Sequence, residues 1–373
     1  KMLERDNTEP LFIVGVPRSG TTLLTSYLVS HPNIESGAET QFFNKISQDE
    51  DALQYALQEE NWPEAAYDLM KKKLTLSGVS VLDLYRKDRE SIILYLSSRK
   101  PSLGAMLESI VIRNSGTSYP QRWLEKTPNH INHLDDIRTY FPSAKILLII
   151  RDPRDSAASI AKLPWAPKST LANALLVENW LANTYKGFEE NSNCLTVSYE
   201  RLITNTEEEL KKVFSFIGEE YSSSILEKKS AAEVTTVAEP WKQDVHRTID
   251  KNHLALWKKR VPQPVLTQIE GIMSACLDFF SYCEPVTDHI QRVELVRVNN
   301  QQFVGLDNFA EVINKNNICL STKRLDASLL YLEKGKLLAV IFKALRMRLL
   351  QKKKVIFVGH KISILRILGS YLE

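Results

Sequence analysis

Residues 11–24 read Leu-Phe-Ile-Val-Gly-Val-Pro-Arg-Ser-Gly-Thr-Thr-Leu-Leu. The apolar run Leu11–Gly15 has the pattern of a buried parallel strand, and apolar residues at helical spacing follow Thr21. Only residues 16–20 lie between them. The stretch therefore predicts a strand, a tight loop and a helix, in which backbone N–H groups at the helix N-terminus face an anion.

The loop has the glycine spacing of the nucleotide-binding pattern G-x-x-x-x-G-K-[ST], but Thr21 occupies the lysine position. Arg18 adds a charged guanidinium with several N–H donors, and Ser19, Thr21 and Thr22 add hydroxyl donors. We expect the loop to bind a phosphate or sulfate group, and the missing lysine disfavours an ATPase or GTPase. The alternative is an ordinary strand–helix turn with a threonine-rich cap.

Strands and helices alternate along the first 217 residues. Further strands are expected at residues 144–150 and 193–199, and residues 49–112 are expected to be mostly helical. Other helices are expected to start near Asp155, with Asp155 or Ser156 as the cap, and to cover residues 175–188 and 205–217. The pattern predicts an α/β fold with a P-loop-like central parallel sheet flanked by helices on both faces.

The chain divides into three parts. Residues 1–10 form a polar N-terminal tail, and residues 11–283 form one domain. Residues 284–373 form a C-terminal α/β extension of unknown role, with strands expected at 293–298 and 355–359 and a helix at 322–350.

Composition excludes several classes of protein. The 373 residues carry a net charge of +3, with 43% hydrophobic and 25% charged residues, so a disordered, collagen-like or histone-like nucleic-acid-binding chain is excluded. No signal-peptide pattern and no apolar run of the ~18 residues that a membrane span needs is present. No pair among the four cysteines has metal-site spacing. We expect buried cysteines, no metal, no nucleic-acid partner, no membrane span and a cytoplasmic location.

Residues 12–24 resemble the 5′-phosphosulfate-binding loop of sulfotransferases that use 3′-phosphoadenosine 5′-phosphosulfate (PAPS). The resemblance implies that the 5′-phosphate and the sulfonate lie among Arg18, Ser19, Gly20, Thr21 and Thr22. Cytosolic members usually have Lys at the position of Arg18. The chain is therefore more similar to members that act on protein tyrosines, carbohydrates and bacterial metabolites.

A second motif supports the same resemblance. Residues 151–159, Arg-Asp-Pro-Arg-Asp-Ser-Ala-Ala-Ser, resemble the family's 3′-phosphate motif, which implies that Arg151 and Ser159 bind the 3′-phosphate. Tyr199 falls where the family often has a tyrosine near the nucleotide. Alternatively, Arg151 forms an ion pair with Asp152 or Asp155. The resemblance covers residues 10–283, about three quarters of the chain.

Candidate catalytic residues follow from two more segments. Residues 122–130 resemble the family segment whose lysine contacts the transferring sulfonate, which implies that role for Lys126 rather than an exposed position in solvent. Pro128 occupies the position of the catalytic histidine of cytosolic members. Residues 37–40, Gly-Ala-Glu-Thr, resemble a segment of tyrosylprotein sulfotransferases, so Glu39 is the first candidate for the general base and His130 the second. Alternatively, Glu39 orders the Arg18 loop through an ion pair.

Basic residues follow in the region 241–260. In related enzymes this region supplies cations to the 3′-phosphate, which implies roles for Arg247, Thr248 and Lys258. The alternative is a solvated charged helix with Trp257 packed inward.

The resemblance implies a sulfotransferase that moves a sulfonate group from PAPS to a hydroxyl group by in-line displacement, releasing adenosine 3′,5′-bisphosphate. The acceptor is a metabolite, a carrier-bound acyl chain, a carbohydrate or a tyrosine. The alternatives are a P-loop-like nucleotide kinase and a non-catalytic nucleotide-binding module of the same fold.

Overall fold

A computed structural model describes residues 9–47, 49–112, 122–163, 166, 170–185, 187–227, 254–282, 294–295 and 320–321. These residues form two compact units. The first takes its described residues from 9–150 and 187–227, and the second from 151–185 and from residue 254 onward. The predicted boundary at residue 283 stays a prediction.

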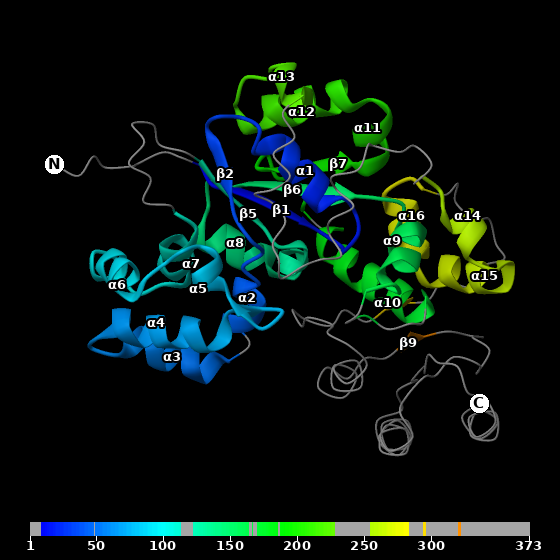
Figure 1. Cartoon of the computed structure of the whole chain (residues 1–373). Helices are drawn as coiled ribbons and strands as arrows, with labels where there is room; N and C mark the ends of the chain where they lie inside the picture. Colours follow the sequence, from blue (N-terminus) through cyan, green and yellow to red (C-terminus); the bar gives the residue numbers. More distant parts are fainter. Residues whose placement is uncertain are drawn as a thin grey trace, which may run out of the picture. The chain divides into compact units, whose positions relative to one another are not determined.

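The first unit is built on a five-stranded parallel sheet in the order β2–β5–β1–β6–β7 (Figure 1). Its strands are β1 (Leu11–Gly15), β2 (Ile34–Ser36), β5 (Arg122–Lys126), β6 (Lys145–Ile150) and β7 (Cys194–Ser198). In the register of the central strand, Leu11 lies opposite Leu124 and Lys145. All five residues of β1 are buried, which confirms the strand expected there.

Helices cover both faces of this sheet, as the sequence predicts (Figure 1). On one side lie α1 (Thr21–Leu28), α12 (Thr206–Ile217) and α13 (Ser224–Glu227). On the other side lie α7 (Leu103–Val111), the 3₁₀ helix η1 (Pro128–His133) and α8 (Leu134–Tyr140). The short helix α11 (Tyr199–Thr204) follows β7 directly. The core between the layers contains the edge-to-face pairs of Trp123 with Phe12 and Phe141, at 5.5 and 5.4 Å between ring centroids.

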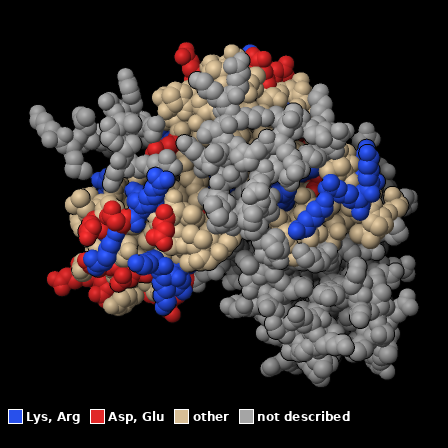
Figure 2. Space-filling view, in the orientation of Figure 1, with Lys and Arg blue, Asp and Glu red and all other residues tan. Residues whose placement is uncertain are grey.

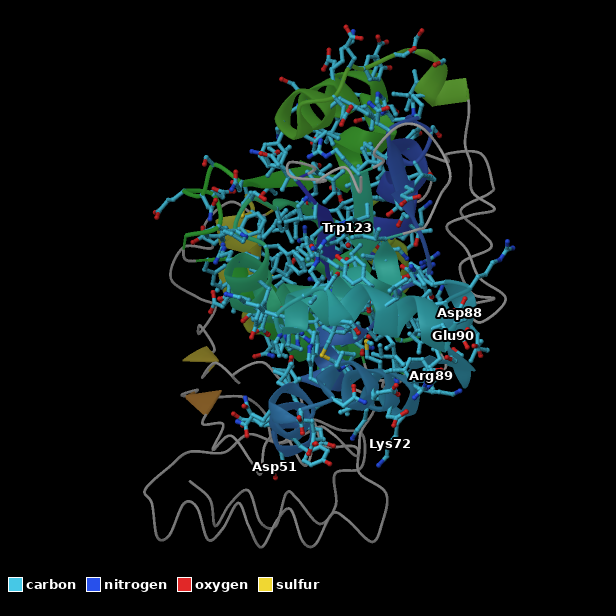
Figure 3. All side chains as sticks on the ribbon, turned by 90° about the vertical axis from the view of Figure 1, so that its left-hand side faces the viewer. Asp51, Lys72, Asp88, Arg89, Glu90 and Trp123 are labelled. Carbon is cyan, nitrogen blue, oxygen red and sulfur yellow. The ribbon has the colours of Figure 1, made fainter. Side chains whose placement is uncertain are left out.

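The segment between β2 and β5 is mostly helical, as expected. It contains α2 (Phe42–Ile46), α3 (Glu50–Gln58), α4 (Trp62–Lys73), a hairpin of β3 (Thr75–Leu76) and β4 (Val79–Ser80), α5 (Val81–Leu84), α6 (Arg89–Ser97) and α7. Figure 3 shows the charged side chains of this layer directed outward and Trp123 inside the unit. The labelled charged residues are Asp51, Lys72, Asp88, Arg89 and Glu90. The outer face of these helices is therefore a solvated surface.

The second unit is mostly helical in its described part. It contains α9 (Pro153–Ile160), α10 (Thr170–Leu181), the 3₁₀ helix η2 (Ala182–Thr184), α14 (Trp257–Arg260), α15 (Gln263–Ile272) and α16 (Ser274–Phe279). Helix α10 packs against α9 and α15, and α14 packs against α9. The strand expected at 293–298 is described only as β8 (Glu294–Leu295), which pairs antiparallel with β9 (Leu320–Ser321). The helix and strand expected at 322–350 and 355–359 lie outside the described residues.

Two helix boundaries differ from the sequence prediction. Helix α9 begins at Pro153, and its cap is Asp152, whose Oδ1 accepts a hydrogen bond from the Arg154 amide at 2.9 Å. Proline is favoured in the first helical turn because it needs no N–H partner there, so the cap precedes the predicted Asp155. Helix α10 begins at Thr170 and not at residue 175.

Two expectations from composition can also be compared with the structure. Cys194 and Cys276 are free and buried, as predicted. Across the part of the chain that the structure describes, no helix combines the length and the apolarity that a bilayer span requires.

Candidate active site

The loop after β1 turns sharply before α1. The Ser19 amide donates to the Val16 carbonyl at 3.3 Å, and Arg18 and Gly20 have positive φ angles of 70° and 104°. Gly20 caps α1 without a side-chain hydrogen bond. Ser19 is fully buried, and its Oγ is without a hydrogen-bond partner among the described residues. A buried hydroxyl and an uncapped helix start are the groups that an anionic phosphate or sulfonate satisfies.

Tyr199 lies against this loop. A Cβ atom on Gly20 would lie 2.4 Å from Cδ2 of Tyr199, so this contact requires glycine at position 20. Tyr199 is the first residue of α11, which is capped by Ser198 Oγ accepting a 3.2 Å hydrogen bond from the Arg201 amide. The structure thus brings the predicted Tyr199 to the predicted anion loop.

Glu39 and Lys126 form a buried ion pair. Lys126 Nζ donates to Glu39 Oε1 at 2.9 Å, and the two residues are 1% and 5% exposed, respectively. Lys126 is the last residue of β5, and Glu39 follows the end of the adjacent β2. The solvated position considered for Lys126 is therefore excluded.

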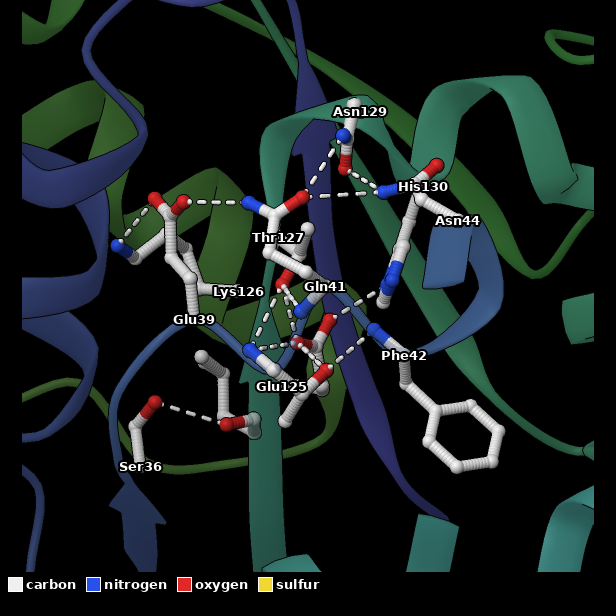
Figure 4. A network of polar contacts seen from close by, with 12 residues as sticks. Ser36, Glu39, Gln41, Phe42, Asn44, Glu125, Lys126, Thr127, Asn129 and His130 are labelled. Carbon is white, nitrogen blue, oxygen red and sulfur yellow. Dashed lines mark hydrogen bonds and ion pairs between the residues drawn. The ribbon is translucent and has the colours of Figure 1, made fainter. Parts of the chain in front are cut away.

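Gln41 holds the second oxygen of Glu39. Its Nε2 donates to Glu39 Oε2 at 3.1 Å, while its Oε1 accepts from Asn129 Nδ2 at 2.8 Å and from Asn44 Nδ2 at 3.2 Å (Figure 4). Because two donors fix the carbonyl end of the amide, the N–H end faces Glu39. The Glu39 carboxylate is thus held on both oxygens.

Glu125 lies next to Lys126 in the strand and, because side chains alternate along a strand, on the opposite face. It is fully buried; its Oε1 accepts from Thr40 Oγ1 at 2.7 Å and from Thr127 Oγ1 at 2.5 Å. Its Oε2 lies 2.8 Å from His130 Nδ1. Burial alone would favour the neutral acid, but the charge and hydrogen bond of His130 and the two hydroxyl groups together lower the pKa of Glu125.

His130 belongs to the Glu125 side of the network. It is fully buried, packs edge-on against Phe43 at 5.0 Å between ring centroids, and is on the side away from the Glu39–Lys126 pair in Figure 4. Its Nε2 is without a hydrogen-bond partner within the described ranges. The structure therefore connects His130 to Glu125.

Tyr85 fixes the segment that carries Glu39. Its hydroxyl donates to the Ala38 carbonyl at 2.7 Å, and a Cβ atom on Gly37 would lie 2.5 Å from the Tyr85 ring. Any larger residue at position 37 would have to displace the tyrosine. Because Gly37 has no Cβ atom, the backbone just before Glu39 can lie in close contact with the Tyr85 ring.

In the second unit, Arg151 and Ser159 lie at the two ends of α9. Of the two acidic partners considered for Arg151, the structure shows Asp155, with Arg151 Nη2 at 3.4 Å from Asp155 Oδ2. Ser156 shares a helix face with Ser159, three residues later. Ser156 is fully buried, and its Oγ is without a hydrogen-bond partner in the described part of the chain. These hydroxyl and guanidinium groups suit a phosphate ligand.

The three residues expected beyond 240 are less defined. Arg247 and Thr248 lie outside the described residues. Lys258 is exposed, with Nζ 5.5 Å from the centroid of the Trp257 ring, and Trp257 is half-buried.

Sequence reasoning assigned no role to several residues in these networks, namely Gln41, Asn44, Tyr85, Glu125, Thr127 and Asn129. It considered Asp155 only as a helix cap or an ion-pair partner of Arg151, and Ser156 only as a helix cap. A signal was present at residues 125–130, where the polar run Glu-Lys-Thr-Pro-Asn-His follows Trp-Leu, because such a run after a buried strand marks the ligand edge of a parallel sheet. Among the described residues, no group of three His, Cys, Asp or Glu side chains is placed to hold a metal ion.

The chain is similar in sequence to known sulfotransferases. The sequence profile of the Sulfotransferase family matches residues 10–223, more than half of the chain. Protein-tyrosine sulfotransferase 2 of Gallus gallus is 26% identical over 297 residues, which cover 74% of this chain and 70% of the relative. Protein-tyrosine sulfotransferase 1 of Homo sapiens is 30% identical over 151 residues, covering 40% of this chain and 33% of the relative.

A solved structure shares the fold. The sulfotransferase domain of the olefin synthase from Synechococcus PCC 7002 superposes with a TM-score of 0.50 and 18% sequence identity, covering 75% of this chain and 98% of that domain. The match of the family profile to more than half of the chain shows that the chain belongs to the sulfotransferase family.

Proposed function

We propose that this protein transfers the sulfonate group of PAPS to the hydroxyl group of an acceptor and releases adenosine 3′,5′-bisphosphate. The observation that carries the proposal is the buried Glu39–Lys126 pair at the carboxyl ends of β2 and β5. The anion loop follows the neighbouring β1, so all three segments lie at the sheet edge where ligands of parallel α/β sheets bind.

The residues divide the chemistry between them. Arg18, Ser19, Gly20, Thr21 and Thr22 hold the 5′-phosphate and the sulfonate through side-chain and backbone donors. Arg151 and Ser159 bind the 3′-phosphate, and Tyr199 lies beside the nucleotide. Roles for Arg247, Thr248 and Lys258 stay predictions, as does the cytoplasmic location.

Glu39 acts as the general base. It accepts the proton of the acceptor hydroxyl as the oxygen attacks sulfur, and the bond from sulfur to the 5′-phosphate oxygen breaks, leaving the electron pair on that phosphate. Lys126 stabilises the negative charge on the sulfonate and on the leaving oxygen. Glu39 is favoured over His130 because Glu39 contacts Lys126, whereas the buried His130 ring contacts Glu125 on the opposite face of β5.

A phenol is the acceptor that we test first. The relatives named above are protein-tyrosine sulfotransferases, and a phenolic hydroxyl, with a pKa of about 10, loses its proton far more readily than an alkyl hydroxyl. A carboxylate base such as Glu39 therefore suits a tyrosine. Carrier-bound hydroxyacyl chains, carbohydrates and small hydroxylated metabolites are the other acceptor classes.

Calorimetry separates the donor from other nucleotides. We expect adenosine 3′,5′-bisphosphate to bind much more tightly than ATP, because the loop lacks the lysine that contacts β- and γ-phosphates. Tight binding of ATP alone would overturn the proposal and favour a kinase.

Transfer of radiolabelled sulfonate from PAPS to a tyrosine peptide, a hydroxyacyl pantetheine and a sugar then tests the reaction. The variant Glu39→Gln should lower kcat about 10²–10⁴-fold while leaving the affinity for adenosine 3′,5′-bisphosphate unchanged. Glu90→Gln on the solvated face of α6 is the matched control and should behave like the unmodified protein. Full activity of Glu39→Gln would exclude Glu39 as the base.

A further inference from the structure

Trp257, at the start of α14, contacts two acidic residues that flank the beginning of α9. Its backbone N–H donates to Asp155 Oδ1 at 2.7 Å, and its indole Nε1–H donates to Asp152 Oδ2 at 2.9 Å. One residue thus binds both carboxylates, although it lies more than 100 positions away in sequence.

Both carboxylates border Arg151. Asp155 uses its other oxygen, Oδ2, to contact Arg151 at 3.4 Å. Asp152, the next residue after Arg151, caps α9 and accepts two hydrogen bonds from the Arg154 guanidinium, at 3.0 and 2.8 Å. The conformation of the Arg151 loop therefore depends on where Trp257 holds these two acids.

Arg154 strengthens the same connection. Its guanidinium lies over the Trp257 ring, 3.9 Å from the ring centroid, and also donates to Glu270 Oε1 at 2.8 Å and to the Tyr282 carbonyl at 3.2 Å. Cation–π contact and charged hydrogen bonds together tie α14, α15 and the residues after α16 to the start of α9.

The contact distances indicate what Trp257 does for Arg151. The Arg151–Asp155 contact is 3.4 Å, longer than the 2.8 Å contacts that Arg154 makes to Asp152 and Glu270. Because the Trp257 amide binds Asp155 Oδ1, the orientation of this carboxylate, and with it the contact of Oδ2 with Arg151, depends on Trp257. A change in the position of Trp257 would therefore be passed through Asp155 to the Arg151 guanidinium.

We propose that Trp257 is a positioning residue for the 3′-phosphate of the nucleotide: by holding Asp152 and Asp155, it sets the orientation of Arg151 and so the preference for ligands that carry a 3′-phosphate. The inference rests on the proposed role of Arg151. It assigns to segment 254–282 a function in donor selection that does not require a direct contact with the nucleotide.

Calorimetry with two ligands tests this inference on the full chain. Adenosine 3′,5′-bisphosphate carries the 3′-phosphate and adenosine 5′-monophosphate lacks it. The variant Trp257→Phe keeps a ring over Arg154 and the backbone N–H that binds Asp155, but it loses the indole N–H that binds Asp152. We expect it to bind the bisphosphate about tenfold more weakly, or about 1.4 kcal/mol, and the monophosphate with nearly unchanged affinity.

Lys259→Ala is the matched control. Figure 2 shows basic side chains gathered where Figure 1 draws α14, and Lys258, Lys259 and Arg260 are all exposed there. Lys259 makes none of the contacts described for Trp257, so this variant should bind both ligands like the unmodified protein.

Each other outcome has a distinct meaning. If Trp257→Phe weakens both ligands equally, Trp257 has only a structural role and the inference is wrong; an unchanged ratio of affinities also overturns it. If Arg151→Ala leaves the ratio unchanged, the proposed 3′-phosphate site itself is wrong. Where monophosphate binding is retained, it also shows that the variant is folded.

Discussion

Two buried ion pairs, one in each unit, illustrate different ways of holding a charge for catalysis or binding. Lys126 and Glu39 are 2.9 Å apart, and Gln41 holds the second oxygen of the carboxylate. Arg151 and Asp155 are 3.4 Å apart, and Trp257 holds the second oxygen of that carboxylate. In both pairs a third residue binds the second oxygen of the carboxylate. Gln41 lies 2 positions from Glu39 in the sequence, whereas Trp257 lies 102 positions from Asp155.

The first pair is supported by neutral amides and hydroxyls within residues 37–129, at the ends of adjacent strands. The second is supported by Trp257 and Glu270 of segment 254–282, together with Asp152 and Arg154 at the start of α9. Neutral donors on strand ends fix geometry closely in a low-dielectric interior, which suits a group that must act on reacting atoms. A distant segment that holds an arginine suits adjustment of ligand affinity. Damage to the first region should therefore lower turnover, and damage to the second should lower binding.

The largest effect is expected for Lys126→Met. Loss of the cation that we propose to contact the sulfonate should lower kcat about 10²–10³-fold, by analogy with removal of other groups that stabilise transition-state charge. The substitution also leaves the buried Glu39 without its cation, which destabilises the fold. Sulfonate-transfer kinetics with the best acceptor and thermal unfolding should be measured together.

The double variant Glu39→Gln plus Lys126→Met provides the control for folding. It removes both charges, so it should recover most of the lost stability but none of the activity. A Lys126→Met protein that is stable and fully active would show that the first region does not carry the chemistry.

A smaller effect is expected for Gln41→Leu. The variant removes the hydrogen bond to Glu39 Oε2 and leaves Asn129 Nδ2 without this acceptor, whereas Asn44 Nδ2 still donates to Asn129 Oδ1. We expect about tenfold lower kcat and an acid limb of the pH profile of kcat/KM that moves to higher pH, because the ionised carboxylate has lost a donor. A stability loss of about 1–3 kcal/mol should accompany it.

Gln54→Leu on the exposed face of α3 is the matched control. It should leave the pH profile in place. If Gln41→Leu lowers stability but its acid limb coincides with that of the unmodified protein, Gln41 supports the fold and does not position Glu39.

The same contrast explains what could be predicted from the sequence. The anion loop, β1, β6 and the Arg151–Asp155 alternative depend on neighbouring residues, and each is visible in a short stretch of sequence. Strand β5 was not predicted because it carries Arg, Glu and Lys, which are usually exposed. These side chains are buried in the structure because residues on other segments form hydrogen bonds and ion pairs with them. Gln41 has no local signal. Trp257 was considered only as an inward-packed residue, since its hydrogen-bond partners lie in α9 and the turn before it.

The smallest effects concern two buried carboxyl groups, one in each unit, whose pKa values are shifted in opposite directions. In the first unit, the pKa of Glu125 is lowered from 4.5 because His130 and hydroxyl donors outweigh burial. In the second, the pKa of Glu178 is raised from 4.5 because burial outweighs its hydrogen bonds with Tyr185 and Cys276. Glu125 therefore contributes stability above pH 4.5 that is lost as the pH falls through its folded pKa. Glu178 contributes stability below pH 4.5 that is lost as the pH rises through its folded pKa.

Urea unfolding of Glu125→Gln and Glu178→Gln at a series of pH values separates the two cases. The free energy of unfolding lost in Glu125→Gln should be larger near pH 6 than near pH 3. For Glu178→Gln, the loss should shrink as the pH rises above 4.5. Each unit of pKa shift corresponds to about 1.4 kcal/mol, which sets the scale of both differences. Parallel pH dependences in the two variants would contradict the opposite electrostatics of the two regions, because only a carboxylate stabilised as an anion and one stabilised as an acid give slopes of opposite sign.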